Sequence, residues 1–216
     1  MFKDRADAGT RLAERLTEYA GRPAVLVLAL PRGGVPVAFE VASRLGVHLD
    51  VFLVRKLGVP GHAELAMGAV AAGNVKVLNE DLIQDLGIPR ALVEQAVVRE
   101  RLELERRDQL YRGGRPVPVV RDRTVILVDD GLATGATMEA AVRALRQQNP
   151  SRVIVAVPVG AADTCRRLRG IADAVECLET PEPFNAVGLW YRNFSQITDE
   201  EVTRLLAGPA QAGRYD

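Results

Sequence analysis

The chain has 216 residues, of which 48% are hydrophobic, and this predicts one compact domain over residues 1–216. Lys plus Arg and Asp plus Glu both number 28, so the net charge is zero, which argues against a broad basic surface for nucleic acid. The N-terminal stretch MFKDRADAGTRLAERL lacks the apolar core of a signal peptide, and no run reaches the ~20 apolar residues of a membrane span. We therefore expect a cytoplasmic protein that binds neither nucleic acid nor membrane.

Short, almost continuously apolar runs alternate with segments of helical spacing along the chain. Runs of this kind are typical of strands buried on both faces, as in a parallel sheet. The strands are predicted over residues 24–30, 49–54, 124–130, 152–159 and 173–179, with helices over 35–46, 138–148 and 161–170. A final short helix is predicted after Thr198, whose spacing to Glu201 is that of a capping box. The alternation predicts an α/β fold with an open, doubly wound, mainly parallel sheet.

Residues 58–123 interrupt this alternation and predict an insertion or flap. The segment holds a Gly/Pro-rich turn, an extended pair over residues 66–79 and a charged helix from Pro89 to Tyr111. On that helix Arg101 and Glu105, and Glu103 and Arg107, are one turn apart and can form ion pairs. Either residues 61–70 or residues 105–116 could close over a site, bringing Arg106, Arg107 and Arg112; a merely solvated charged face is the alternative.

The stretch VILVDDGLATGAT places two acids and a small-residue loop at the end of a predicted strand. Asp129 and Asp130 fall at its carboxyl end, where open α/β sheets bind ligands. The loop then enters a helix, so its backbone amides and the helix dipole can hold a phosphate. The phosphate-binding residues predicted are Ala133, Thr134, Gly135, Ala136 and Thr137. Because carboxylates repel a phosphate, the acids fit a sugar diol and a hydrated Mg²⁺, which predicts a ribose phosphate as ligand.

A second anion loop is predicted after the first strand. Arg32 offers a forked donor and the two glycines that follow it allow unusual backbone dihedrals, which suits pyrophosphate; a tight turn with an exposed arginine is the alternative. Arg55 and Lys56 follow the second predicted strand and are expected to flank the same anion, unless they belong to an ordinary basic loop. The pyrophosphate-binding residues predicted are Pro31, Arg32, Gly33, Gly34, Arg55 and Lys56.

Four apolar residues, two acids, three variable positions and then T-G-x-T together resemble the ligand signature of the type I phosphoribosyltransferases. The whole chain looks most like uncharacterised bacterial phosphoribosyltransferase-like proteins. The resemblance implies that residues 133–137 hold the 5-phosphate of phosphoribosyl pyrophosphate, that Asp129 and Asp130 hold its ribose hydroxyls and that the loop at Arg32 holds its pyrophosphate. It implies Mg²⁺-dependent transfer of the phosphoribosyl group to a small nitrogenous acceptor, with Asp129, Asp130 and Arg32 as the catalytic residues.

The acceptor is expected to be a nucleobase-like heterocycle but not a 6-oxopurine. Members of the family that salvage hypoxanthine and guanine have an Asp directly before the Thr-Gly, where this chain has Ala133. Residues 179–197 are the candidate hood over the acceptor. Their aromatic side chains could stack on a flat ring, or could instead plug the sheet edge or a homo-oligomer interface. These side chains are Phe184, Trp190, Tyr191 and Phe194.

Two other functions fit the same sequence. The site could bind phosphoribosyl pyrophosphate or a nucleotide as a regulatory signal without turnover. Alternatively, it could hydrolyse a phosphorylated sugar, with water as the acceptor. Release of pyrophosphate or phosphate, with and without a base, distinguishes these functions from phosphoribosyl transfer.

Overall fold

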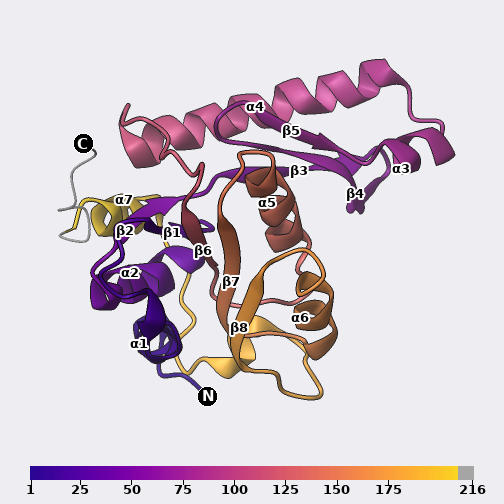
Figure 1. Ribbon diagram of the computed structural model, residues 1–216. Coiled ribbons are helices and arrows are strands. Elements are labelled where there is room, and N and C mark those ends of the chain that lie inside the picture. Colours follow the sequence, from indigo (N-terminus) through magenta and orange to yellow (C-terminus); the bar gives the residue numbers. More distant parts are fainter. Residues whose placement is uncertain (209–216) are drawn as a thin grey trace.

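The centre of the protein is a five-stranded parallel sheet with strand order β2-β1-β6-β7-β8 (Figure 1). The computed structural model describes residues 1–208, except the side chains of residues 63 and 64. The open sheet with helices on both faces confirms the predicted doubly wound α/β class. The strands are β1 (Val25–Ala29), β2 (His48–Val51), β6 (Thr124–Val128), β7 (Arg152–Val159) and β8 (Ala174–Glu179).

Helices cover both faces of the sheet because strand side chains alternate in direction. In β1, Val27 and Ala29 join the core under one set of helices, whereas Leu26 and Leu28 join the core under the other set. The first set is α1 (Arg5–Arg15), α2 (Gly34–Leu45) and α7 (Asp199–Leu206), and the second is α5 (Ala136–Arg146) and α6 (Ala162–Leu168). Two short 3-10 helices, η1 (Thr17–Tyr19) and η2 (Val187–Trp190), complete this part of the chain.

Local sequence explains where several helices begin and how closely they pack. The Thr198 hydroxyl accepts a hydrogen bond from the Glu201 amide at 3.2 Å, so the predicted cap of the last helix forms. No helix was predicted near the N-terminus, but α1 begins there with Asp4 as its cap. Gly9 lets α1 lie directly on α2, because a Cβ at this position would be 2.5 Å from the Val37 carbonyl oxygen.

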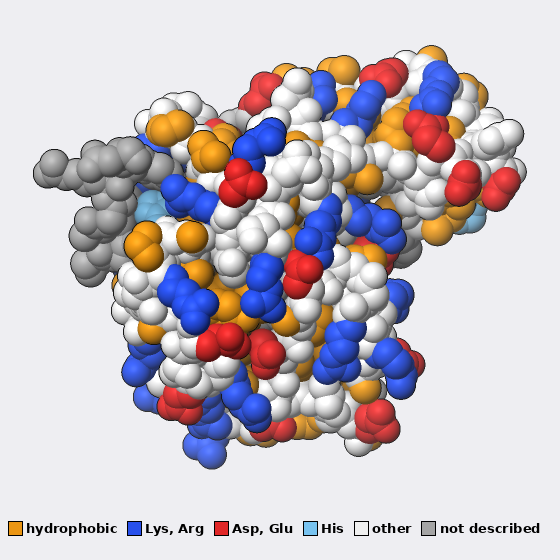
Figure 2. Space-filling model, viewed as in Figure 1, with side chains coloured by type: hydrophobic (Ala, Val, Ile, Leu, Met, Phe, Trp, Pro, Cys, Tyr) orange, Lys and Arg blue, Asp and Glu red, His pale blue; other side chains and the backbone are white. Residues whose placement is uncertain are grey.

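The predicted insertion is a folded arm that projects from the sheet (Figures 1 and 2). It contains an antiparallel sheet of order β3-β4-β5 and a long helix that lies along it. The extended pair and the long charged helix predicted in this region are both confirmed. The elements of the arm are β3 (Val54–Val59), β4 (His62–Ala71), β5 (Val75–Leu78), α3 (Glu80–Asp85) and α4 (Arg90–Arg112).

The second core strand was predicted too long. Residues 49–54 were assigned to one strand, but β2 ends at Val51 and Val54 already begins β3 of the arm. An apolar run carries no marker for the point at which the chain passes from one sheet to another. As a result, Arg55 and Lys56 lie within a strand of the arm instead of in a loop after a core strand.

Arg112 anchors the arm to the sheet. The prediction that it is a cation on a segment that closes over the site is therefore wrong. Its side chain is fully buried, with Nε 3.2 Å from Oδ1 of Asp50 and Nη2 donating to the Val51 carbonyl oxygen at 2.5 Å. It also pairs with Asp108 one turn earlier in α4. A buried guanidinium needs such partners, which fixes the end of α4 against β2.

Candidate functional site

The two predicted anion loops meet at the carboxyl edge of the sheet. A Cβ on Gly33 would lie 2.1 Å from Oδ2 of Asp130, and a Cβ on Gly34 would lie 2.9 Å from Cα of Asp129. Both glycines are therefore required by close contact with the acidic pair. The structure thus brings together the Arg32 loop and the two acids, which are almost a hundred positions apart in sequence.

Burial raises the pKa values of both acids of the pair. Burial, together with the neighbouring charge of Asp130, raises the pKa of Asp129 well above its usual range. Burial also raises the pKa of Asp130, but the guanidinium of Arg5 opposes this effect. Arg5 reaches Oδ2 of Asp130 with Nε and Nη2, both at 2.8 Å. Arg5 was not predicted as a site residue, because nothing in the pattern of α1 indicates that its first residue meets the carboxylate that follows β6.

The loop after the acidic pair presents backbone amides at the start of α5. Gly135, the residue before the helix, has a φ of +71°, which favours glycine. Within residues 1–208, no protein group accepts a hydrogen bond from the backbone amides of residues 133–137. These amides and the positive end of the helix dipole suit an anion. The Thr134 and Thr137 side chains can add hydroxyl donors.

Helix α6 supports this loop from outside, which the sequence did not reveal. The buried Thr164 hydroxyl donates to the Ala133 carbonyl oxygen at 2.7 Å, and Nη2 of Arg167 donates to the Thr134 carbonyl oxygen at 2.6 Å. A Cβ on Gly135 would lie 2.4 Å from Cγ2 of Thr164, so the loop packs directly on this side chain. The two carbonyl groups are therefore held toward α6, which fixes the conformation of the loop.

Arginines of the arm line a cavity between the two anion loops. Its walls include Pro31 from one loop, Thr137 from the other, Arg55 of β3 and Arg107 of α4. Strand alternation places Lys56 on the face of β3 opposite to Arg55, and Lys56 is not among the described residues that line this cavity. Of the two basic residues predicted here, only Arg55 is thus placed beside both loops.

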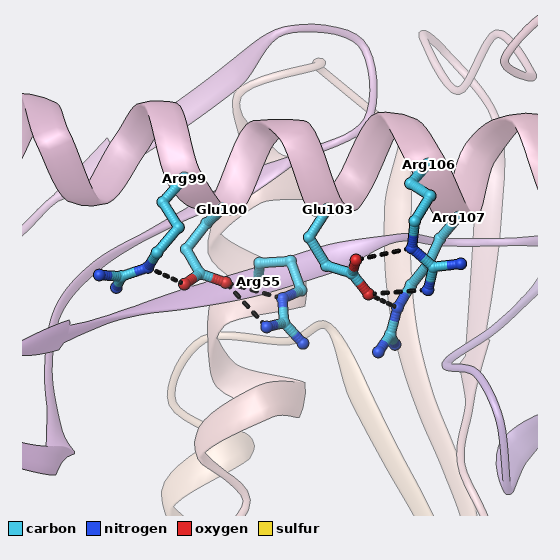
Figure 3. Close-up of polar contacts among 6 residues, drawn as sticks. All are labelled: Arg55, Arg99, Glu100, Glu103, Arg106 and Arg107. Carbon is cyan, nitrogen blue, oxygen red and sulfur yellow. Dashed lines mark hydrogen bonds and ion pairs between the residues drawn. The ribbon is translucent and has the colours of Figure 1, made fainter.

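Glutamates of α4 hold these arginines in a row along the helix (Figure 3). Glu100 pairs with Arg55 at 2.8 Å and with Arg99 at 3.0 Å. Glu103 pairs with Arg106 and with Arg107, and these hydrogen bonds lower the pKa of Glu103 to about 2. The Glu103–Arg107 pair was predicted, whereas the predicted Arg101–Glu105 pair is not found in the described part of the chain.

Residues 179–197 approach the acidic pair from the other side. Tyr191 is 6% exposed, packs against Phe2 and donates its hydroxyl to the Asp130 carbonyl oxygen at 2.5 Å. This placement gives Tyr191 a supporting role and leaves its ring no open face for the predicted stacking on an acceptor. Phe184 and Trp190 pack partly buried around the same aromatic cluster, so their stacking role stays a prediction.

A second pocket opens between this segment and the Arg32 loop. Arg5, Arg32, Asp130 and Phe194 contribute to its walls, together with residues 195–197. Phe194 is the aromatic residue of the segment that lines this pocket, and Arg5 covers one face of its ring at 3.9 Å. Arg32 lies at the rim, where Nη1 is 3.9 Å from Oδ1 of Asp199 at the start of α7.

The described residues contain no group of three or more His, Cys, Asp or Glu side chains arranged to hold a metal ion. Two neighbouring carboxylates nevertheless suit a Mg²⁺ ion that is bound mainly by substrate oxygens and water. No helix within residues 1–208 is long and apolar enough to cross a membrane. Acidic and basic side chains are interspersed over the face shown in Figure 2, as the zero net charge suggested.

Comparison with known proteins gives a match over most of the chain. The phosphoribosyl transferase domain family matches residues 2–191. Two proteins of Mycobacterium tuberculosis, from strains CDC 1551 and H37Rv, are each named "Putative phosphoribosyl transferase" and are 48% identical over 220 residues. These alignments cover 100% of this chain and 49% of each relative, so the chain spans about half the length of the curated relatives.

A solved structure extends the similarity to three dimensions. The crystal structure of TT1426 from Thermus thermophilus is 46% identical in sequence and superposes with a TM-score of 0.87. The match covers 95% of this chain and 97% of that chain. Sequence and architecture therefore agree over nearly the whole length of both proteins.

Proposed function

The chain belongs to the phosphoribosyl transferase domain family, and we propose that it transfers a phosphoribosyl group from phosphoribosyl pyrophosphate to a nitrogenous acceptor, releasing pyrophosphate. The observation that carries this proposal is the contact between Gly33 and Asp130. It joins an arginine-bearing loop and a carboxylate pair at one edge of the sheet. An amide-lined loop follows that pair directly, so the three groups match the pyrophosphate, ribose and phosphate of one ligand.

Each part of the ligand has a corresponding group in the chain. The backbone amides of residues 133–137, which have no acceptor within residues 1–208, would hold the 5-phosphate. Asp129 and Asp130 would accept hydrogen bonds from the ribose hydroxyls. Arg32 and Arg55 would pair with the pyrophosphate, and Arg107 would add a third guanidinium from α4. Lys56 remains a prediction for the same anion from the opposite face of β3.

In the proposed reaction, the bond from C1 of the ribose to a pyrophosphate oxygen breaks and a bond from C1 to the acceptor nitrogen forms. The acceptor nitrogen loses its proton to the departing pyrophosphate, and no protein nucleophile is needed. The arginines stabilise the charge that develops on the leaving pyrophosphate, while Asp129 and Asp130 orient the ribose. Bound Mg²⁺ would supply further neutralisation of the pyrophosphate charge. The two carboxylates fit such an ion through ribose hydroxyls or water.

The acceptor proposed is a flat heterocycle other than a 6-oxopurine. The methyl group of Ala133 cannot accept a proton or a hydrogen bond from a base. The pocket lined by Phe194 and Arg32 lies beside Asp130, where an acceptor could approach the ribose. Phe184 and Trp190 are retained as further candidates for contact with the acceptor ring.

Titration calorimetry with phosphoribosyl pyrophosphate, with and without Mg²⁺, tests the ligand first. We expect Mg²⁺-dependent binding that is tighter than binding of ribose 5-phosphate. Asp130→Asn should weaken it by about 10- to 100-fold, because a charge-assisted hydrogen bond is lost. Asp163→Asn is the matched control, because the Asp163 side chain is 84% exposed on α6. No saturable binding at millimolar ligand would contradict the proposal.

Turnover is tested by measuring pyrophosphate release from phosphoribosyl pyrophosphate in the presence of adenine, pyrimidine bases and hypoxanthine. Release that needs one of the bases other than hypoxanthine supports phosphoribosyl transfer. Release without any base would instead indicate hydrolysis. Tight binding without release under any of these conditions would indicate a regulatory role.

A further inference from the structure

Arg5 connects the first helix to the acidic pair through contacts on several sides. Its Nε and Nη2 both meet Oδ2 of Asp130 at 2.8 Å, and its Nη1 donates to the Ser195 carbonyl oxygen at 2.8 Å. The guanidinium also lies 3.9 Å from the centre of the Phe194 ring. Only 8% of the residue is exposed. A guanidinium bound on all these sides has little freedom to leave the carboxylate.

The backbone around Arg5 is also fixed. The Phe2 amide donates to the Trp190 carbonyl oxygen at 2.7 Å, and the Arg192 amide donates to the Phe2 carbonyl oxygen at 2.9 Å. The Asp4 side chain accepts from the Asp7 amide at 2.9 Å and so caps α1 just before Arg5. The fold thus holds the backbone on both sides of Arg5. Arg5 therefore sets the position of the Asp130 side chain through their ion pair.

Two side-chain donors of Arg5, Nε and Nη2, meet the same oxygen of Asp130. The ion pair uses Oδ2 and leaves Oδ1 to another partner. The backbone of Asp130 is also held, because the Tyr191 hydroxyl donates a hydrogen bond to the Asp130 carbonyl oxygen at 2.5 Å. The carboxylate is therefore fixed in rotation, and Asp130 lines the pocket to which Arg32 and Phe194 also contribute.

We propose that Arg5 is a positioning residue that holds Asp130 so that its Oδ1 accepts a hydrogen bond from a ribose hydroxyl, and that this contact selects ribose over 2-deoxyribose. This role rests on the proposed function. It concerns mainly the sugar, because Arg5 contacts Asp130 directly and does not line the cavity that holds Arg55 and Arg107. Loss of Arg5 should therefore reduce recognition of the sugar hydroxyl more than recognition of pyrophosphate, which Arg5 affects only through the contact between Asp130 and Gly33.

The test compares calorimetric binding of ribose 5-phosphate, 2-deoxyribose 5-phosphate and pyrophosphate to the full chain. The wild type should prefer the ribose compound. In Arg5→Gln, affinity for ribose 5-phosphate should fall by about tenfold, whereas affinity for the other two ligands should fall by clearly less. Arg11→Gln is the matched control on the same helix, because the Arg11 side chain is 49% exposed and pairs with Asp7. It should bind all three ligands as the wild type does.

Arg5→Lys separates positioning from folding. An ammonium keeps the charge but has a single nitrogen, so it cannot hold one oxygen from two nitrogens as Arg5 does, and the preference for ribose should fall by about threefold in a variant that still folds. If Arg5→Gln does not fold, as judged by thermal unfolding, Arg5→Lys alone decides the question. An equal loss of affinity for all three ligands, or a wild-type preference in the folded variants, would overturn the role of Arg5.

The outcome for the wild type distinguishes this inference from the proposed function. If the wild type binds neither phosphoribosyl pyrophosphate nor ribose 5-phosphate, the proposed function fails, and the role of Arg5 fails with it. If the wild type binds both but does not prefer ribose over 2-deoxyribose, the proposed function stands and only the role of Arg5 is overturned.

Discussion

Gly33 lies so close to Asp130 that a single added methyl group would overlap the carboxylate, at 2.1 Å from Oδ2. Gly33 itself has a helical backbone, with φ of −60° and ψ of −34°, which any residue can adopt. The glycine is therefore required by contact and not by backbone conformation. Through this contact the position of the Arg32 loop depends on the position of the acidic pair.

Gly33→Ala should lower the affinity for phosphoribosyl pyrophosphate by about tenfold, because Asp130 has to move away from Arg5 to make room. The melting temperature should fall less than in Gly34→Ala, since a side-chain carboxylate can shift where a backbone carbonyl group cannot. Gly34→Ala should instead destabilise the fold by about 1–3 kcal/mol, because its Cβ would lie 2.7 Å from the Val128 carbonyl oxygen. Calorimetry and thermal unfolding measure the two effects. Equal behaviour of the two variants would contradict this prediction.

Thr164→Val should weaken binding of ribose 5-phosphate by about fivefold and leave pyrophosphate binding unchanged. The substitution removes the hydrogen bond to the Ala133 carbonyl oxygen that fixes the phosphate loop, which is worth about 1 kcal/mol. Thr164→Ser keeps the hydroxyl and is the control. A loss of pyrophosphate affinity in the valine variant would show that the substitution disturbs more than this loop.

Arg55→Gln should weaken pyrophosphate binding, because Arg55 lines the cavity between the two anion loops. The loss of one charge-assisted contact corresponds to about tenfold in affinity. Lys56→Gln is the comparison, since it changes the same charge on the other face of the same strand. Arg55→Gln should have the larger effect in calorimetric titrations with pyrophosphate. A larger effect at Lys56 would place the anion on the opposite face of β3.

Arg112→Met should destabilise the fold by about 3–5 kcal/mol, because Asp50, which is 3% exposed, would keep a buried charge without its partner. The double variant Asp50→Leu with Arg112→Met should recover most of this loss, since it removes both charges. Chemical denaturation of both variants measures the difference. If the double variant is as unstable as Arg112→Met, the loss comes from altered packing and not from the unpaired charge of Asp50.

The contact between Tyr111 and Asp199 should make the free energy of unfolding depend on pH in the alkaline range. Burial and the hydrogen bond to Asp199 raise the pKa of Tyr111 to about 12, so the folded state favours the neutral phenol. This stabilisation is complete below the unfolded pKa of about 10 and is lost as the pH rises toward 12. The wild type should therefore lose free energy of unfolding relative to Tyr111→Phe over this interval. A constant difference between the two proteins would contradict the prediction.

The strands and motifs were predictable because their signals are local. Continuous apolar runs indicated the parallel sheet, and the positions of Asp129 and Asp130 followed from the end of one such run. The same kind of signal failed between Val51 and Val54, where an unbroken apolar run crosses from one sheet to another. The N-terminal helix was missed for a different reason, since the charges among its apolar residues were interpreted only as evidence against a targeting segment.

The residues that support the site were not predictable in this way. Arg5, Thr164 and Tyr191 reach the acidic pair or the phosphate loop from elements distant in sequence, and their own neighbours give no sign of it. Arg112 illustrates the converse, because a charged residue in a charged segment was expected to be exposed and proved to be fully buried. Side-chain burial and pairing depend on which elements pack together, and local patterns do not carry that information.

The sequence by itself determined the class of fold and the places of the two loops at the ends of strands, because hydrophobic period, glycine and acid spacing act over a few residues. Only the tertiary structure decided that Gly33 contacts Asp130, that Arg5 fixes this carboxylate, and that Arg55 instead of Lys56 lines the cavity between the loops. These relationships arise from the packing of helices and strands far apart in the chain, and packing is set by the whole fold at once.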